Sequence, residues 1–205
     1  MAAIAALGMN AGLFNNEVTY TKRGTTFALV AQKAQSVNLS IYAEGTGGKP
    51  VKTVAMRKGE KGVWKAEVKG DLKGRFYTFN VKQDGKMLGE TPGLFAKAVG
   101  VNGKRGAIID MAATNPEGWE SDRALGYAPT DIIVYESHIR DFSVSRKEAR
   151  YPGKFLALTE PWAIEHLKSL GVTAIHLLPS FDYASVDEEH LDRPQFNWGY
   201  DPLNY

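Results

Sequence analysis

Hydrophobic and polar residues alternate with a period of two from Val18 to Val81. This alternation is typical of antiparallel strands that bury one face. Glycine-containing turns separate the segments, and Asp84-Gly85 is a dipeptide favoured in two-residue hairpins of type I′. The strands that the pattern predicts are Thr25–Val30, Ser36–Tyr42, Val51–Met56, Val63–Val68 and Phe76–Val81. Short strands at this spacing predict an immunoglobulin-like β-sandwich.

The pattern changes at Asp131. Residues 132–135 form a continuous apolar run, and residues 172–178 are predicted to form a second buried strand that Pro179 closes. Such runs are expected of parallel strands that are covered on both faces. With a helix between them they predict one βαβ unit, the building block of parallel sheets and barrels. A (β/α)8 barrel needs eight strands, so this module is predicted to be incomplete by itself.

The helix between these strands is predicted to open at Thr159-Glu160-Pro161. Thr159 would be the N-cap, Glu160 would lie in the first turn, and Pro161 would lie where its missing N–H costs little. Gly171 would end the helix as its C′ residue. The buried stripe would consist of Trp162, Ile164 or His166, Leu167 and Leu170.

The charge of the chain divides near residue 112. Residues 1–112 hold 17 Lys and Arg against 8 Asp and Glu, a net charge of +9, whereas residues 113–205 hold 8 against 15, a net charge of −7. The shift favours two modules. A basic front half is also compatible with nucleic-acid binding. Its basic residues are spaced singly along alternating segments, however, and this spacing favours a solvated strand face.

Composition sets further bounds. A hydrophobic content of 43% and a charged content of 23% are those of an ordinary soluble globular protein. The absence of cysteine excludes disulfides and thiolate metal sites. The apolar stretch Met1–Phe14 lacks a basic region and is too short to span a bilayer. We expect an N-terminal arm there, with a degenerate export signal as the alternative, so the cellular location stays open.

Aromatic side chains of the sandwich are candidates for stacking on sugar rings. Tyr77 and Phe79 share one face of a predicted strand, and Phe76 points the other way. On alternating strands most such residues belong to the core. We therefore expect core roles, with sugar binding by Trp64 as the alternative.

Polar residues follow the first apolar strand, at the end where barrel active sites lie. Among Glu136, His138, Arg140 and Asp141 we expect Glu136 and Arg140 to form a supporting pair. His176, within the second strand, is expected to be a core histidine. An acidic loop follows, which we expect to be solvated, with calcium binding as the alternative because hard oxygen ligands cluster there. Its acidic residues are Asp182, Asp187, Glu188, Glu189 and Asp192.

Residues 196–202 read Phe-Asn-Trp-Gly-Tyr-Asp-Pro. This segment is similar to Tyr-Asn-Trp-Gly-Tyr-Asp-Pro, the signature of type I pullulanases within the α-amylase superfamily, and departs from it only at Phe196. Residues 131–143 and 171–179 resemble the first and second barrel strands of that family. Residues 96–106 and 114–119 resemble the connection between its modules. The sandwich resembles the starch-associated module before these barrels, but Val30-Ala31-Gln32 stands for Trp-Ala-Pro and Gly93-Leu94-Phe95 for Asp-Pro-Tyr.

The resemblance implies retaining hydrolysis of α-1,6 branch points in pullulan or branched starch, without a required cofactor. The family takes its nucleophilic Asp, its acid/base Glu and a third Asp from barrel strands four, five and seven. We therefore predict no catalytic residue within these 205 residues, and no activity of the chain alone. The family's motif implies that Tyr200 stacks on the sugar where cleavage occurs, with packing inside the loop as the alternative. For Trp198 the same two roles, contact with the sugar and packing inside the loop, are both left open. Asp201 is a third candidate of the binding site, and we expect it to accept backbone hydrogen bonds.

The expected organisation is an N-terminal arm (1–17), a starch-associated β-sandwich (18–112), a connector (113–130) and the truncated start of a catalytic barrel (131–205). The expected partners are an α-glucan polysaccharide or oligosaccharide and the rest of the barrel, and neither nucleic acid nor a membrane. The rival hypothesis is a noncatalytic α-glucan-binding module in which only the sandwich matters. The sequence does not choose among pullulan, glycogen and starch.

Overall fold

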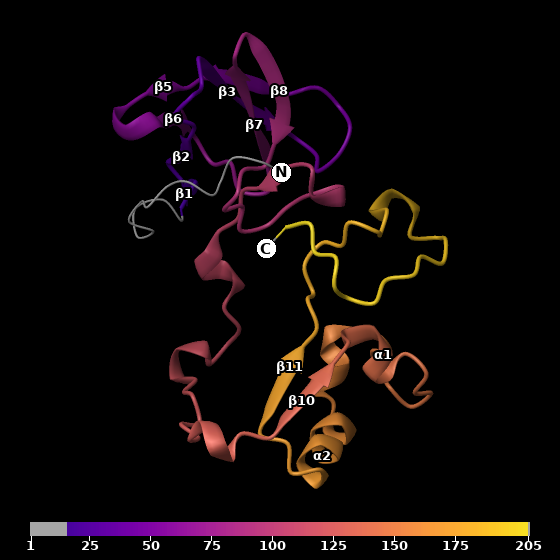
Figure 1. Ribbon diagram of the computed structural model, residues 1–205. Helices are drawn as coiled ribbons and strands as arrows, with labels where there is room; N and C mark the ends of the chain where they lie inside the picture. Colours follow the sequence, from indigo (N-terminus) through magenta and orange to yellow (C-terminus); the bar gives the residue numbers. More distant parts are fainter. Residues whose placement is uncertain (1–15, 205) are drawn as a thin grey trace. The chain divides into compact units, whose positions relative to one another are not determined.

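The structure is a computed structural model that describes residues 16–204 (Figure 1). Most of the expected N-terminal arm, and with it the alternative of an export signal, lies outside the described residues. The chain divides into two compact units. Unit 1 extends to Asn115, and unit 2 comprises Pro116–Leu203. None of the helices in residues 16–204 has the length and apolar content of a membrane span.

Unit 1 is a sandwich of two antiparallel sheets, as the alternation predicts. The first has the order β1-β2-β6-β5, and the second has the order β4-β3-β7-β8, with β9 beside β7. The strands are β1 (Val18–Thr21), β2 (Gly24–Val30), β3 (Ser36–Tyr42), β4 (Lys52–Ala55), β5 (Arg57–Lys58), β6 (Val63–Lys69), β7 (Phe76–Gln83), β8 (Lys86–Thr91) and β9 (Gly106–Ala107). All five predicted strands are confirmed, and this architecture is consistent with an immunoglobulin-like sandwich.

The predicted hairpin turn is also confirmed. It joins β7 to β8, where Gln83 pairs with Lys86. Asp84 and Gly85 both have positive φ angles, 49° and 77°. Two successive positive φ values are the requirement of a type I′ turn, whose twist matches that of the flanking strands.

The core of unit 1 lies between the two sheets. Phe27 of β2 and Tyr77 of β7 meet edge to face with 5.4 Å between ring centroids, and Phe79 lies at the same distance from Tyr77. Trp64 is 6% exposed, and its Nε1–H donates to the carbonyl of Ala31 at 3.0 Å. The core roles expected of Trp64, Tyr77 and Phe79 are therefore confirmed, and a sugar platform on Trp64 is wrong. Phe76 is half-buried.

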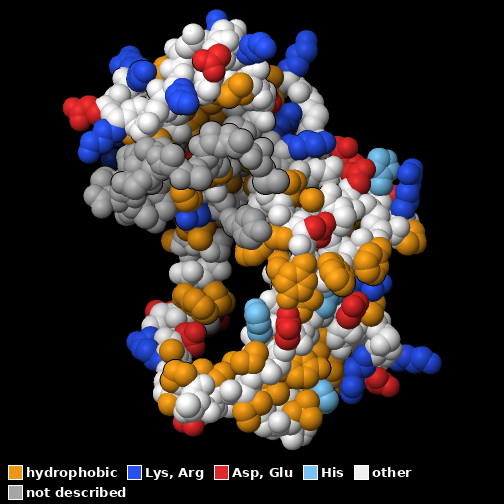
Figure 2. Space-filling view, in the orientation of Figure 1, with side chains coloured by type: hydrophobic (Ala, Val, Ile, Leu, Met, Phe, Trp, Pro, Cys, Tyr) orange, Lys and Arg blue, Asp and Glu red, His pale blue; other side chains and the backbone are white. Residues whose placement is uncertain are grey.

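Basic residues lie on the surface of unit 1, where Figure 2 shows blue side chains. Lys52, Arg57, Lys58, Lys65 and Lys69 are exposed members of the strands. This arrangement agrees with the solvated strand face that the spacing predicts, although Arg57 of β5 lies directly opposite Lys65 of β6.

Unit 2 contains the parallel strands β10 (Val134–Ser137) and β11 (Ala174–Leu177), which pair from Val134↔Ala174 onward. Between them lie α1 (Ile139–Ser143), η7 (Phe155–Thr159) and α2 (Pro161–Ser169). The strand–helix–strand order and the parallel pairing thus agree with the sequence pattern. The first strand begins at Val134, later than expected, and residues 129–131 form a 3-10 turn before it. The remaining 3-10 turns are η2 (Glu60–Gly62), η3 (Val101–Gly103), η4 (Met111–Thr114), η5 (Trp119–Ser121), η6 (Pro129–Asp131) and η8 (Glu188–His190).

The N-cap of α2 is Glu160, so the prediction of Thr159 is wrong. Thr159 ends η7, and its hydroxyl donates to the carbonyl of Leu156 at 2.8 Å. Glu160 does not cap the helix with its side chain but accepts from the backbone N–H of Arg150 and Tyr151, at 3.1 and 3.0 Å. The carboxylate thus holds the preceding loop.

The C-terminus of α2 agrees with the prediction. Gly171 has a φ of 72°, its N–H donates to Lys168, and the N–H of Val172 donates to Leu167. These two bonds form a Schellman motif with Gly171 at C′. The predicted stripe is confirmed at Leu167, which is buried beside Ala163, and in part at Trp162, which stacks on Phe142. Trp162 is half-buried, whereas Ile164, His166 and Leu170 are exposed.

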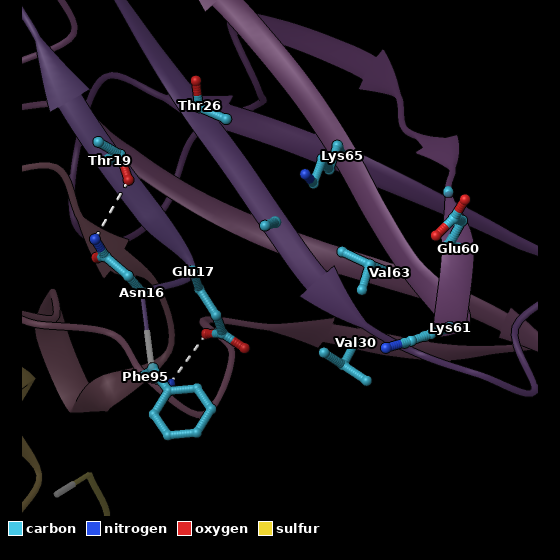
Figure 3. Close-up of a pocket in the computed structure, with 12 residues that line it drawn as sticks. Asn16, Glu17, Thr19, Thr26, Val30, Glu60, Lys61, Val63, Lys65 and Phe95 are labelled. Carbon is cyan, nitrogen blue, oxygen red and sulfur yellow. Dashed lines mark hydrogen bonds between the residues drawn. The ribbon is translucent and has the colours of Figure 1, made fainter. Parts of the chain in front are cut away.

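Glu17 is a buried carboxyl group just before β1. It is 5% exposed, and its Oε2 accepts from the N–H of Phe95 at 3.0 Å (Figure 3). Gly93 has a φ of 91°, and a Cβ atom there would lie 2.1 Å from Oε2 of Glu17. Only glycine fits this approach. Burial raises the pKa of Glu17 above its ordinary value of 4.5, against the opposing effect of the Phe95 and Leu94 backbone N–H groups.

We expect Glu17→Gln to remove a pH dependence of stability. Because the pKa of Glu17 is higher in the folded than in the unfolded chain, the folded state binds more protons. Its stabilising contribution is present below pH 4.5 and is lost as the pH rises through the raised pKa. In urea unfolding between about pH 4 and 8, the free energy of unfolding of Glu17→Gln should rise relative to wild type with increasing pH. Glu67→Gln, at an exposed position of β6, is the control, and parallel curves for wild type and Glu17→Gln would contradict the prediction.

Candidate functional site

The candidate site lies at the carboxyl ends of β10 and β11, where the loop after β11 returns to the strands. The hydroxyl of Tyr200 donates to Oε1 of Glu136 on β10 at 2.5 Å. The N–H of Leu178 donates to the carbonyl of Ser137 at 3.0 Å, which extends the pairing past β11. The motif 196–202 is therefore brought to the strand ends where active sites of parallel β/α folds lie.

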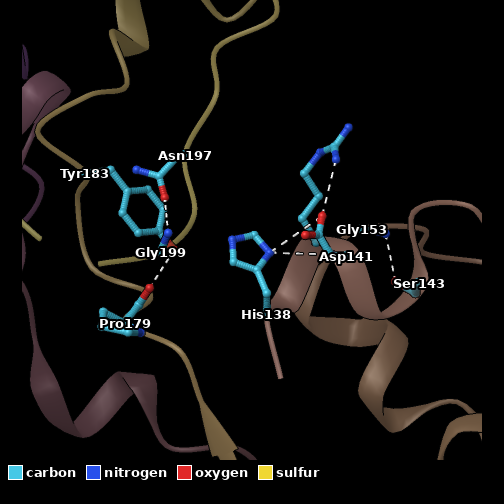
Figure 4. Close-up of polar contacts among 9 residues, drawn as sticks. His138, Asp141, Ser143, Gly153, Pro179, Tyr183, Asn197 and Gly199 are labelled. Atoms are coloured by element: carbon cyan, nitrogen blue, oxygen red, sulfur yellow. Dashed lines mark hydrogen bonds and ion pairs between the residues drawn. The ribbon is translucent and has the colours of Figure 1, made fainter. Parts of the chain in front are cut away.

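The conformation and close packing of this loop require glycine at position 199. Its φ is 95°, a value that other residues rarely adopt. A Cβ atom there would lie 3.2 Å from Cδ2 of His138 and from Cδ2 of Leu178. The glycine thus lets the backbone pack directly against both side chains. Figure 4 shows His138 and Gly199 together with the polar contacts around them.

Asn197 and Asp201 hold the loop from within. Oδ1 of Asn197 accepts from the N–H of Gly199 at 2.6 Å, and its Nδ2 donates to Oγ of Ser185 at 2.9 Å and to Oδ1 of Asp201. Oδ2 of Asp201 accepts from the N–H of Ser185 at 2.8 Å. The prediction that Asp201 accepts a backbone hydrogen bond is confirmed. A hydrogen bond from the Ser185 side chain is the main cause that lowers the pKa of Asp201, against an opposing effect of burial.

The aromatic residues of the motif are exposed. Tyr200 is 56% exposed and Trp198 is 70% exposed. Both rings therefore have surface available for stacking on a sugar. The hydrogen bond to Glu136 raises the pKa of Tyr200.

Two expectations for the polar residues are wrong. Glu136 bonds Tyr200, whereas Arg140 pairs with Asp141 at 3.5 Å, so the expected Glu136–Arg140 pair does not form. His176 is exposed and is not a core histidine. The reason is that β11 pairs only with β10 within the described residues, so the sheet has no further strands around it.

His138 has a role that sequence reasoning missed. It is the N-cap of α1, and its Nδ1 accepts from the N–H of Asp141 at 3.3 Å. The ring nitrogen satisfies one of the donors that a helix N-terminus leaves unpaired. His138 therefore links α1 to the loop that carries Gly199.

The acidic loop is organised by its own hydrogen bonds. Asp187 caps η8 by accepting from the N–H of Glu189 at 3.1 Å, and its Oδ2 lies 2.7 Å from Nδ1 of His190. The side chain of Gln195 donates to the carbonyl of Asp187 at 2.9 Å. Within residues 16–204 no three His, Asp or Glu side chains gather as they would around a metal ion. Calcium binding by this loop stays a prediction.

Unit 1 offers less aromatic surface than its composition suggests. The guanidinium of Arg105 lies 3.6 Å from the ring centroid of Tyr42, and the hydroxyl of Tyr42 donates to Glu90 at 2.5 Å. Tyr42 is 3% exposed, so its ring offers no open face. Phe95 is 41% exposed and lines a cavity of about 550 Å³ together with Glu17 (Figure 3).

Comparison with known proteins gives a consistent set of relatives. Residues 14–94 match the family "Carbohydrate-binding module 48 (Isoamylase N-terminal domain)". The chain is 36% identical over 197 residues to a pullulanase of Bacillus subtilis, covering 91% of this chain and 26% of that protein.

Solved structures agree. The apo pullulanase of Paenibacillus barengoltzii is similar with a TM-score of 0.85 and 42% identity, over 91% of this chain and 30% of that one. The same enzyme in complex with maltohexaose and α-cyclodextrin also gives a TM-score of 0.85 at 42% identity, over 91% and 31%. The chain thus spans between a quarter and a third of the length of these proteins.

Proposed function

We propose that the chain is the N-terminal part of a debranching glycoside hydrolase, because residues 14–94 match the family model of carbohydrate-binding module 48 and the chain is homologous to pullulanases over 91% of its length. The proposed reaction is hydrolysis of α-1,6-glucosidic linkages in pullulan or branched starch with retention of configuration. Such a reaction uses two carboxyl groups about 5–5.5 Å apart, one as nucleophile and one as acid/base. We place both groups beyond residue 205, and the reaction needs no cofactor.

The observation that carries the proposal is the extent of the likeness. At 42% identity and a TM-score of 0.85 it covers 91% of the chain, far more than the 14–94 segment of the carbohydrate-binding module. A binding module alone accounts for unit 1 only. The likeness of the residues beyond this segment supports a connector in residues 113–130 and the start of a catalytic (β/α)8 barrel in residues 131–205. The match to the carbohydrate-binding module supports a starch-associated sandwich in residues 18–112.

Within this proposal the aromatic residues of the loop bind the glucan. The exposed rings of Tyr200 and Trp198 supply flat apolar faces for sugar rings at the carboxyl ends of the strands. Asp201 supports the site by holding the loop through Ser185 and Asn197. The maltohexaose and α-cyclodextrin complex of the Paenibacillus barengoltzii enzyme supports an α-glucan as the ligand class.

The match to a carbohydrate-binding module also favours a second candidate function, a noncatalytic α-glucan-binding module. In that case only unit 1 would bind sugar. The burial of Trp64 and the covering of Tyr42 by Arg105 weigh against an aromatic platform on those two residues. The two candidates differ in what the chain does when it is joined to a complete barrel.

The test uses a chimaera in which this chain replaces the aligned 30% of the Paenibacillus barengoltzii pullulanase. We expect the chimaera to release reducing ends from pullulan and the 205-residue chain alone to release none above a blank. Circular dichroism melting establishes that both proteins are folded. Turnover by the isolated chain would contradict the placement of the catalytic carboxyl groups beyond residue 205. A folded chimaera without activity, together with maltohexaose binding by unit 1, would favour the binding module.

A further inference from the structure

We propose that Glu136 is a positioning residue that fixes the ring of Tyr200 and acts on glucan binding only through the tyrosine hydroxyl. The two residues are 64 positions apart in the chain and meet through one hydrogen bond of 2.5 Å. The inference rests on the proposed function, because it requires that Tyr200 contact the sugar.

The acceptor is held by regular structure. Glu136 is the third residue of β10 and pairs in register with His176 of β11. A hydrogen bond from a hydroxyl to an ionised carboxylate is roughly twice as strong as one between neutral groups. A strand therefore supplies a fixed point for a side chain that belongs to a loop.

The backbone on both sides of Tyr200 is held as well. Gly199 packs against His138 and Leu178, and Asp201 is bonded to Ser185 and Asn197. With the backbone fixed, the freedom that remains to the tyrosine is rotation of its side chain. The bond to Glu136 removes this freedom, while the ring stays 56% exposed. A ring ordered before binding loses less entropy when a sugar stacks on it.

The first measurement tests the contact in the chain itself. Tyrosine labelled with ¹³C at Cζ is titrated by NMR, and the signal of Tyr200 is assigned by its loss in Tyr200→Phe. The bond to Glu136 raises the pKa of Tyr200, so Glu136→Gln should lower it. Glu165→Gln, at an exposed position of α2, should leave it unchanged. An unshifted pKa in Glu136→Gln would refute the inference and leave the proposed function intact.

The second measurement tests whether Glu136 acts through the hydroxyl of Tyr200. It uses the kinetics of pullulan hydrolysis by the chimaera. Glu136→Ala and Tyr200→Phe should each raise KM by about 3- to 10-fold, with a smaller change in kcat, because both remove ordering of the ring. The double variant should equal the single variants, since both changes break the same bond. Glu136→Gln keeps a neutral acceptor and should restore part of the affinity.

The outcomes separate the two proposals. If the increases in KM caused by Glu136→Ala and Tyr200→Phe multiply in the double variant, Glu136 acts independently of the hydroxyl. This result would overturn the inference. An effect of Glu136→Ala that persists in a Tyr200→Ala background would do the same. If the chimaera hydrolyses pullulan and Tyr200→Ala leaves KM and kcat unchanged, the glucan-binding role proposed for Tyr200 fails, and the inference fails with it.

Discussion

Phe79→Ala should lower the free energy of unfolding of unit 1 by about 3–5 kcal/mol, the usual range for a buried Phe→Ala substitution. Phe79 is completely buried between the sheets and contacts the ring of Tyr77 edge to face. The substitution removes the apolar area and leaves a cavity that rigid sheets fill poorly. Since domains are stable by roughly 5–15 kcal/mol, this loss is a large part of the total.

The measurement is urea unfolding of Phe79→Ala and of a matched control. Phe95→Ala removes the same side chain at a position that is 41% exposed, and the bond from its backbone N–H to Glu17 is independent of the side chain. We expect the control to lose about 1 kcal/mol or less. Equal losses in both variants would show that the ring of Phe79 is not part of the core that stabilises unit 1.

The strands of unit 1 were predictable because their signal is local. Each alternates with a period of two, and burial of one face selects that period. β1 (Val18–Thr21) was not among the predicted strands although it carries this signal, with alternating burial along its four residues. Two other strands that sequence reasoning missed, β5 and β8, lack it. β5 has only Arg57 and Lys58, and β8 is exposed along its whole length. Their pairing with β6 and β7 depends on backbone hydrogen bonds, which a pattern of side chains does not record.

The candidate site was predictable only in part. The motif itself places Tyr200, Trp198 and Asp201 in one segment, but the partner of Tyr200 lies 64 positions earlier. The pattern instead suggested Arg140 as the partner of Glu136, because opposite charges close in sequence are the pairs that a sequence shows. Glu136 bonds Tyr200 because the loop after β11 folds back to the strand ends. The close packing of Gly199 against His138 and Leu178 allows this path of the loop.

The N-cap of α2 shows a similar limit. Thr159 has the residue type of a cap, but its hydroxyl is used by Leu156 in the preceding turn. Glu160 takes the N-cap position because the chain turns from η7 into α2 at that residue. Propensity ranks residue types for a cap, whereas the geometry of the preceding segment chooses the position.

We expect the isolated chain to associate through the surface around β10 and β11. Ile133 and Val134 are 53% and 57% exposed, and Ile175 is 40% exposed. Figure 2 shows hydrophobic side chains gathered around these strands. Parallel sheets are normally covered on both faces, and each strand of a two-stranded sheet has an unpaired edge. Burying each of these side chains fully would contribute roughly 1.5–3 kcal/mol, so association is favoured.

Size-exclusion chromatography with light scattering on the isolated chain provides the measurement. Soluble oligomers should form, and Val134→Lys should reduce them because a charge at this position resists burial. Val51→Lys is the control, because Val51 is an apolar side chain of unit 1 that is 61% exposed. This substitution should leave the amount of oligomer unchanged. Adding the remaining part of the Paenibacillus barengoltzii pullulanase as a separate polypeptide should convert the oligomers into a defined complex, because under the proposed function it would supply the neighbouring strands and covering helices of the barrel. A monodisperse monomer whose cooperative melt includes unit 2 would show that this surface needs no cover, and the proposal of a truncated barrel would lose its physical basis.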